Sequence, residues 1–182
     1  MISKQIKVLI VEDEKIVALD TKDMLESLGY SVTAIASFKE EALKKLEETK
    51  PDLALLDIRL YGSIAGVEIA EYIRIHHKIP FIYVTAYADE NTLERAKTTA
   101  PYGYILKPFE EKELHTTIQI ALCKHDFEGE IKKETENSLA IIINRSELTL
   151  EEGHSKHDQE ILQRAEQIRE AAHTINETIQ KL

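Results

Sequence analysis

The sequence has few of the residues that cross-link a chain, and it has no long apolar run. Cys123 is its single cysteine, which excludes an intramolecular disulfide and a cysteine-based metal cluster. Its place in a helical pattern predicts a small buried hydrophobic side chain. No stretch of roughly 18 consecutive apolar residues occurs, and the N-terminus lacks the apolar segment of a secretory signal. We therefore expect a cytoplasmic protein that does not insert into a membrane.

Positive charge is also scarce. The 182 residues include 33 acidic and 23 basic side chains, for a formal net charge of -10, and no run of Lys and Arg stands out. This balance argues against a surface for nucleic-acid phosphates or anionic lipid, so no nucleic-acid partner is expected. Hydrophobic residues make up 43% of the chain, enough for a packed core in one domain with an appendage or in two small domains.

Up to about residue 122, short apolar runs alternate with longer amphipathic segments. The runs, which predict strands, are 7–13, 31–37, 52–57, 80–86 and 102–107. The amphipathic segments, which predict helices, are 15–29, 38–50, 65–77, 89–100 and a last one that begins after Pro108. Strands that are apolar on both faces and alternate with helices are typical of a parallel sheet covered on both sides. The sequence therefore predicts an α/β fold.

Polar side chains stand where the predicted strands end. The third strand, in DLALLDIRLYG, ends at Asp57, and the ends of the first, fourth and fifth carry Glu12 with Asp13, Thr85, and Lys107. An ionised side chain is costly to bury within a sheet, but ligands bind at the carboxyl edge of parallel strands. These side chains are therefore expected to meet at one edge of the sheet.

The residue types at this edge indicate a chemistry. Three carboxylates repel one another unless a cation lies among them, and Mg²⁺ suits such oxygen ligands. A lysine and a threonine across the site can bind the oxygens of a phosphoryl group. The set predicts phosphoryl transfer with Asp57 as the nucleophile, which forms an acyl phosphate. Taken singly, Glu12 and Asp13 could instead favour the next helix through its dipole, and Thr85 and Lys107 could be ordinary strand and surface residues.

Four sequence blocks carry a resemblance to a known family. VLIVEDE, LALLDIRL, YVTAYAD and PYGYILKPFEEKEL have the order and spacing of the response-regulator receiver domain of two-component signalling, over about residues 5–122. The resemblance implies a flavodoxin-like, doubly wound sheet of five parallel strands in the order 2-1-3-4-5. It implies that Asp57 accepts phosphate from a sensor histidine kinase, with Mg²⁺ as cofactor. The metal would be held by Asp13, Asp57 and the backbone carbonyl of Arg59, with Glu12 acting through water.

The same resemblance gives roles to residues of the last two strands. Thr85 and Lys107 would bind the phosphoryl oxygens, and Tyr104 would be the switch aromatic that turns inward when the threonine moves. Large side chains at Arg59 and Tyr87, two positions beyond the nucleophile and the threonine, predict slow self-dephosphorylation. Such a domain would catalyse only its own Mg²⁺-dependent phosphorylation and dephosphorylation.

From about residue 110 the pattern changes to long helices. The segment to about residue 152 has few helix breakers apart from Gly129, and a second helix follows a polar loop. Two apolar sets in the second helix recur every seven residues, namely Ile161, Ile168, Ile175 and Leu182, and Ala165, Ala172 and Ile179. They fit the a and d positions of a heptad, and so short a hairpin cannot bury them alone. We predict a receiver domain, 1–124, and a hairpin, 125–182, that forms a homodimeric four-helix bundle; packing on its own receiver is the alternative.

The hairpin has a resemblance of its own. KETENSLAIIINRSELTLEE is similar to the dimerisation and phosphoacceptor helix of sensor histidine kinases, but Lys133 stands at the histidine position and Ser138 at the proline position. Autophosphorylation there is therefore not expected, and neither is a kinase catalytic domain. The tail histidines are interpreted as solvated side chains rather than phosphate carriers or metal ligands: His125, His154, His157 and His173.

The expected function is that of a response regulator that signals through protein contacts or dimer rearrangement and not through DNA. The tail has neither helix-turn-helix spacing nor a basic recognition helix. A phosphate sink or a phosphorelay intermediate is the alternative, and a transcription regulator is the less favoured one.

Overall fold

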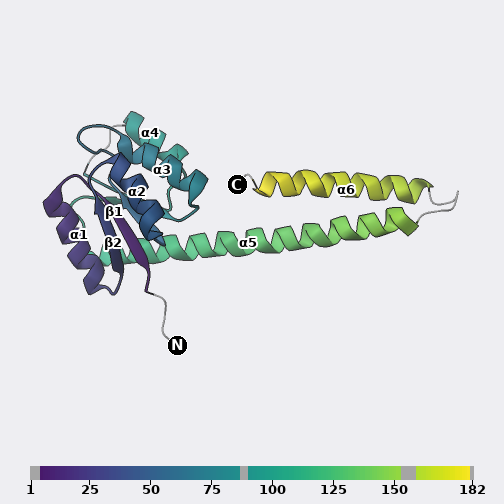
Figure 1. Ribbon diagram of the computed structural model, residues 1–182, viewed down its shortest axis with the longest axis horizontal. Helices are drawn as coiled ribbons and strands as arrows, with labels where there is room; N and C mark the ends of the chain where they lie inside the picture. Colours follow the sequence, from purple (N-terminus) through teal and green to yellow (C-terminus); the bar gives the residue numbers. More distant parts are fainter. Residues whose placement is uncertain (1–4, 87–89, 153–158, 181–182) are drawn as a thin grey trace. The chain divides into compact units, whose positions relative to one another are not determined.

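The computed structural model describes residues 5–86, 90–152 and 159–180 (Figure 1). The chain divides into two compact units, Met1–His125 and Asp126–Leu182. Within the described residues, no helix is long and apolar enough to cross a membrane.

The first unit is built on a parallel sheet. Its strands are β1 (Lys7–Val11), β2 (Ser31–Ala36), β3 (Leu53–Leu56), β4 (Phe81–Thr85) and β5 (Gly103–Leu106), in the order β2-β1-β3-β4-β5. The predicted strand order is therefore confirmed. Strands β3 and β4 are buried along their whole length, as expected for strands that are covered on both faces.

Helices cover both faces of this sheet. They are α1 (Lys15–Ser27), α2 (Lys39–Thr49), α3 (Ala65–His76), α4 (Glu90–Thr98) and the first part of α5 (Glu111–Glu152). One core cluster joins the sheet to buried residues of α2, α3 and α4, and the other joins it to α1 and α5. The predicted first residue of the fourth helix, Asp89, lies outside the described residues.

Helix α5 is continuous through Gly129, which the sequence alone left open. Its buried residues in the first unit, Leu114, Ile118 and Ala121, recur every three or four positions and so share one face. Cys123 is exposed, and the prediction that it is buried is wrong. It follows Ala121 by two residues, about 200° around the helix, and so points away from the sheet.

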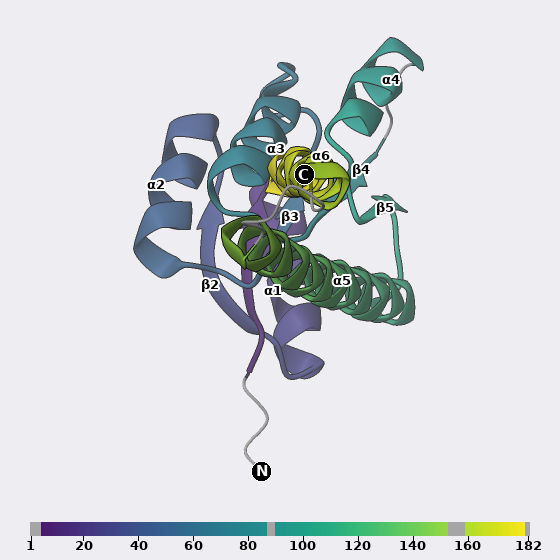
Figure 2. The same ribbon diagram turned by 90° about the vertical axis from the view of Figure 1, so that its right-hand side faces the viewer.

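The second unit contains the rest of α5 and helix α6 (Gln159–Gln180), which lie side by side (Figures 1 and 2). Its buried residues recur every seven positions on each helix: Leu139 and Ser146 on α5, and Ala165 and Ala172 on α6. The isoleucines of the other predicted set are 54%, 52% and 49% exposed at positions 161, 168 and 175. The predicted heptad seam is thus split into a buried alanine row and an exposed isoleucine row. Leu182 lies outside the described residues.

Candidate functional site

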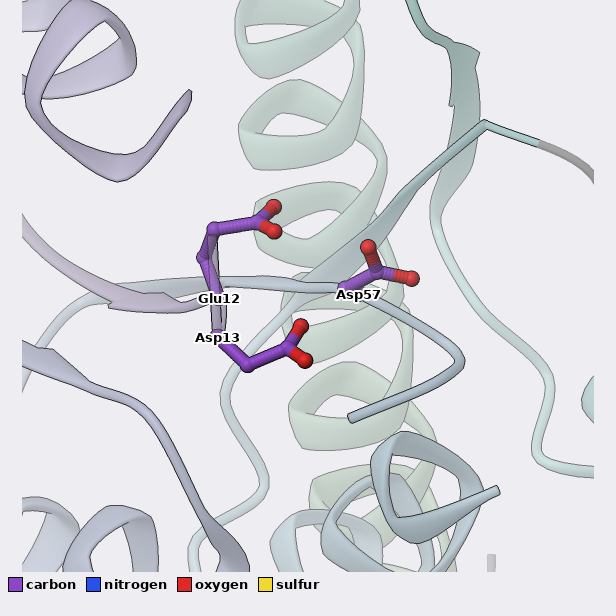
Figure 3. A group of neighbouring side chains, drawn as sticks. All are labelled: Glu12, Asp13 and Asp57. Carbon is purple, nitrogen blue, oxygen red and sulfur yellow. The ribbon is translucent and has the colours of Figure 1, made fainter. Parts of the chain in front are cut away.

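The carboxyl ends of β1 and β3 bring three carboxylates together. Glu12 and Asp13 directly follow β1, and Asp57 directly follows β3. One oxygen from each lies within 4.8 Å of the others (Figure 3). Backbone hydrogen bonds continue the sheet by one residue here, because the Glu12 N–H donates to Ala36 O over 2.9 Å and the Asp57 N–H donates to Val11 O over 2.9 Å. The sheet itself therefore holds these side chains at its edge.

Lys107, which follows β5, reaches two of these carboxylates. Its Nζ is 2.6 Å from Asp57 Oδ2 and also donates to Glu12 Oε2. Its backbone N–H donates to Thr85 O over 2.9 Å, which ties the end of β4 to the same place. One ammonium against three carboxylates leaves an excess of negative formal charge, and oxygen ligands of this kind suit a divalent cation such as Mg²⁺.

Burial and charge shift the proton affinities at the site. Burial raises the pKa of Glu12, although Lys107 opposes the shift. Burial also acts to lower the pKa of Lys107, but its hydrogen bonds and charge interactions with Asp57 and Glu12 outweigh this effect and raise it overall. The lysine therefore stays protonated at neutral pH and can stabilise negative charge next to Asp57.

The Asp57 side chain is held on both oxygens. Oδ2 accepts from Lys107, and Oδ1 accepts from the backbone N–H of Arg59 over 3.0 Å. A carboxylate that binds the N–H two residues on stabilises a local turn. The nucleophile proposed from the sequence therefore has a fixed orientation.

Two contacts at the site were not predicted from the sequence. Asp13 Oδ2 accepts from the backbone N–H of Tyr61 over 2.7 Å. Gly66, in α3, lies so close to Asp57 that a Cβ there would be 1.9 Å from the Asp57 carbonyl oxygen. A glycine is unfavourable within a helix, and its presence there can mark a close backbone approach; this was the one available sequence signal for the second contact.

Thr85 and Tyr104 lie on the last two strands. Thr85 is buried at the end of β4, whereas Tyr104 on β5 is 38% exposed. The two tyrosines Tyr83 and Tyr104 are paired across the strands, with ring centroids 5.4 Å apart. Burial raises the pKa of Tyr104. In this structure the predicted switch aromatic is thus partly open to solvent.

The remaining predicted positions differ in their surroundings. His125 is not a solvated linker residue, because its Nε2 lies 2.8 Å from Lys78 O and its ring contacts Tyr102 edge to face. It belongs to the first unit. His173 is exposed, as are Lys133 and Ser138. Three predicted positions lie outside the described residues: Tyr87, His154 and His157.

Comparisons with known proteins agree with this architecture. A family model for the response regulator receiver domain matches residues 8–119. The transcriptional regulatory protein PdtaR of Mycobacterium tuberculosis is 30% identical over 118 residues, which are 65% of this chain and 57% of PdtaR. The sensor kinase CckA of Brucella abortus is 34% identical over 121 residues, which are 65% of this chain and 13% of CckA. The chain thus spans little more than half of PdtaR and a small part of CckA.

Solved structures give the same result. The signal receiver domain of a modulated diguanylate cyclase from Desulfovibrio desulfuricans G20 is 38% identical, with a TM-score of 0.65, and the match covers 69% of this chain and 99% of that one. A CheY-like receiver domain protein from Methanospirillum hungatei JF-1 is 30% identical, with a TM-score of 0.63 and the same coverage. The chain belongs to the response regulator receiver domain family.

Proposed function

We propose that this protein is a response regulator whose Asp57 accepts a phosphoryl group from a sensor histidine kinase. The observation that carries the proposal is the contact of Lys107 with Asp57 and Glu12, next to a third carboxylate at the same sheet edge. The sensor kinase CckA, which contains a segment similar to this chain, supports a kinase as the phosphate donor.

The transfer needs little from the protein beyond positioning and charge. An oxygen of Asp57 attacks the phosphorus of a phosphorylated imidazole, so that a P–O bond forms as the P–N bond breaks. The electron pair of the broken bond stays on the imidazole nitrogen. Lys107 compensates the negative charge on the phosphoryl oxygens, and the buried hydroxyl of Thr85 is a further donor to them. The Arg59 N–H keeps the carboxylate oriented.

The donor set also fits Mg²⁺. Asp13 and Asp57 would hold the ion together with the Arg59 carbonyl, and Glu12 would act through water. When bound, the ion would neutralise charge on the carboxylates and on the incoming phosphoryl group. The excess of carboxylates over ammonium groups at this edge supports the fit.

The first experiment is intact-mass spectrometry after incubation with acetyl phosphate and Mg²⁺. The native protein is expected to gain a single phosphoryl adduct, and Asp57→Asn is expected to gain none. Asp52→Asn is the matched control, because Asp52 precedes the same strand at its opposite end and accepts from the Lys7 N–H over 2.9 Å. An adduct on Asp57→Asn, or none on the folded native protein, contradicts the proposal.

We further propose that the second unit makes the protein a homodimer. Each helix of this unit has a buried heptad row and an exposed one. The exposed row on α6 consists of Ile161, Ile168 and Ile175, and on α5 the exposed residues Phe127, Ile141 and Leu148 are spaced by multiples of seven. Burying the exposed half of an isoleucine is worth about 1 kcal/mol. Every copy of the chain carries the same exposed rows. The rows of one hairpin can therefore pack against those of a second hairpin, which have the same heptad spacing.

Signalling would then follow from protein contacts and not from DNA. PdtaR is named as a transcriptional regulatory protein, so transcription control is the competing function. The exposed apolar rows of the helical hairpin, together with the lack of helix-turn-helix spacing in the sequence, favour dimer rearrangement. A phosphate sink needs only the receiver, and it would leave the exposed rows without a role.

A further inference from the structure

The loop between β3 and α3 contains a tight two-residue turn. The Leu60 N–H donates to Ser63 O over 2.9 Å, and the Ser63 N–H donates to Leu60 O over 3.0 Å. The two central residues, Tyr61 and Gly62, have φ values of 49° and 78°. Positive φ at both central positions is the mark of a type I′ turn. We refer to residues 60–63 as the Tyr61 turn.

The first residue of this turn is held in the core, and the last residue is bonded back to the first. Leu60 is buried, and the Ser63 hydroxyl donates to Leu60 O over 2.9 Å. A tyrosine with positive φ is uncommon because its Cβ crowds the backbone. Such conformations persist where the surrounding structure holds them, and they cluster at functional sites.

The turn makes one contact with the acidic site. The backbone N–H of Tyr61 donates to Asp13 Oδ2 over 2.7 Å. The Tyr61 side chain is 71% exposed, so the contact belongs to the backbone and not to the ring. Asp13 and Glu12 both extend toward Asp57 (Figure 3), so the Tyr61 N–H binds a carboxylate that belongs to the acidic group.

We propose that the Tyr61 turn positions Asp13 for Mg²⁺ and thereby sets the affinity of the site for the ion. An unrestrained aspartate samples several staggered rotamers, and the Tyr61 N–H selects one of them. Tyr61 is thus a positioning residue that acts through Asp13. The inference rests on the Mg²⁺ site of the proposed function.

Three variants distinguish an effect of the Tyr61 turn on Mg²⁺ affinity from a general loss of stability. Gly62→Val places a β-branched residue at φ 78°, and a Cβ there has no atom within 4 Å, so its effect is on the backbone of the turn. Gly29→Val is the matched control, since Gly29 has φ 86° and equally open surroundings but lies after α1 and outside the acidic group. Tyr61→Asn keeps the N–H and introduces a residue that tolerates positive φ better.

The measurement is an Mg²⁺ titration of the full chain followed by amide NMR, without any phosphoryl donor. Loss of a partner that orients a metal ligand lowers affinity by about 10- to 100-fold, so Gly62→Val is expected to weaken binding by about tenfold or more. Gly29→Val is expected to stay within about twofold of the native protein, and Tyr61→Asn to bind as tightly or more tightly.

Each outcome bears on the inference. A Gly62→Val variant that binds Mg²⁺ with native affinity overturns it. Equal weakening of Mg²⁺ binding in Gly62→Val and Gly29→Val also overturns it, because that result would reflect general strain. In both cases a native protein that binds Mg²⁺ and takes up phosphate would leave the proposed function intact. A native protein that binds no Mg²⁺ overturns both.

Discussion

Gly66 lies against the backbone that carries the proposed nucleophile. A Cβ built on it would be 1.9 Å from Asp57 O and 2.9 Å from Ile58 Cα, distances at which the start of α3 must move away from the end of β3. Overpacking of this kind costs about 1–3 kcal/mol. We expect Gly66→Ala to lower the free energy of unfolding by that amount, measured by urea denaturation, and to slow phosphorylation by acetyl phosphate.

The control for this variant is the same substitution at another helical glycine. Gly129 has no atom within 4 Å of a Cβ position, and alanine in a helix interior is more favourable than glycine by up to about 1 kcal/mol. Gly129→Ala is therefore expected to be as stable as the native protein or more so. Native stability and native phosphorylation in Gly66→Ala would show that the close approach is not required.

At the residue scale, the charged residues of the site could be predicted from the sequence, but the backbone contacts that position them could not. Glu12, Asp57 and Lys107 could be placed together because the ends of parallel strands share one edge, whatever the loops do. The bond from the Tyr61 N–H to Asp13 depends on a turn with two positive φ values, and a tyrosine gives no sequence indication of such a conformation. Gly66 could have been recognised as a position of close packing. That it packs against the backbone of Asp57 follows only from the path of α3.

At the scale of the element, a single introduced charge can test whether the exposed isoleucine row of α6 forms the dimer contact. Ile168 is half exposed, so Ile168→Glu adds no buried charge to an isolated chain but places one in the proposed dimer contact, where an unpaired charge is strongly unfavourable. We expect this variant to be a monomer of native helical content, by sedimentation equilibrium and circular dichroism. Gln167→Glu, which adds the same charge at an exposed neighbouring position, should remain a dimer. The proposal would be contradicted if both variants were dimers, or if the native protein were a monomer.

The helices show what a repeat can and cannot predict. The strict interval of seven indicated that both rows of α6 lie along one seam, and Ala165 and Ala172 are indeed buried. The interval does not say which neighbour buries which row. The small alanines are buried within the hairpin, while the larger isoleucines remain half exposed in a single chain.

At the scale of the whole molecule, α5 belongs to both units. It begins at Glu111, in the unit that carries Asp57, and continues to Glu152, beyond the boundary at His125. Because a helix transmits displacement along its hydrogen-bonded backbone, we expect the phosphorylation state of Asp57 to change the dissociation constant of the dimer. Couplings between sites are typically about 1–3 kcal/mol, or roughly 5- to 150-fold. Sedimentation with and without beryllofluoride, a stable mimic of the aspartyl phosphate, measures this change.

Substitutions at Gly129 test whether the helix carries the coupling. Gly129→Pro removes a backbone donor and clashes with the preceding turn, which breaks or kinks the helix at a cost of about 3 kcal/mol, whereas Gly129→Ala keeps the helix intact. We expect the alanine variant to respond to beryllofluoride as the native protein does, and the proline variant to bind it without any change in dimer dissociation. A proline variant that still responds would mean that the signal reaches the hairpin by a route other than α5. A native protein whose dimer is unchanged by beryllofluoride would mean that the receiver signals through contacts of its own surface.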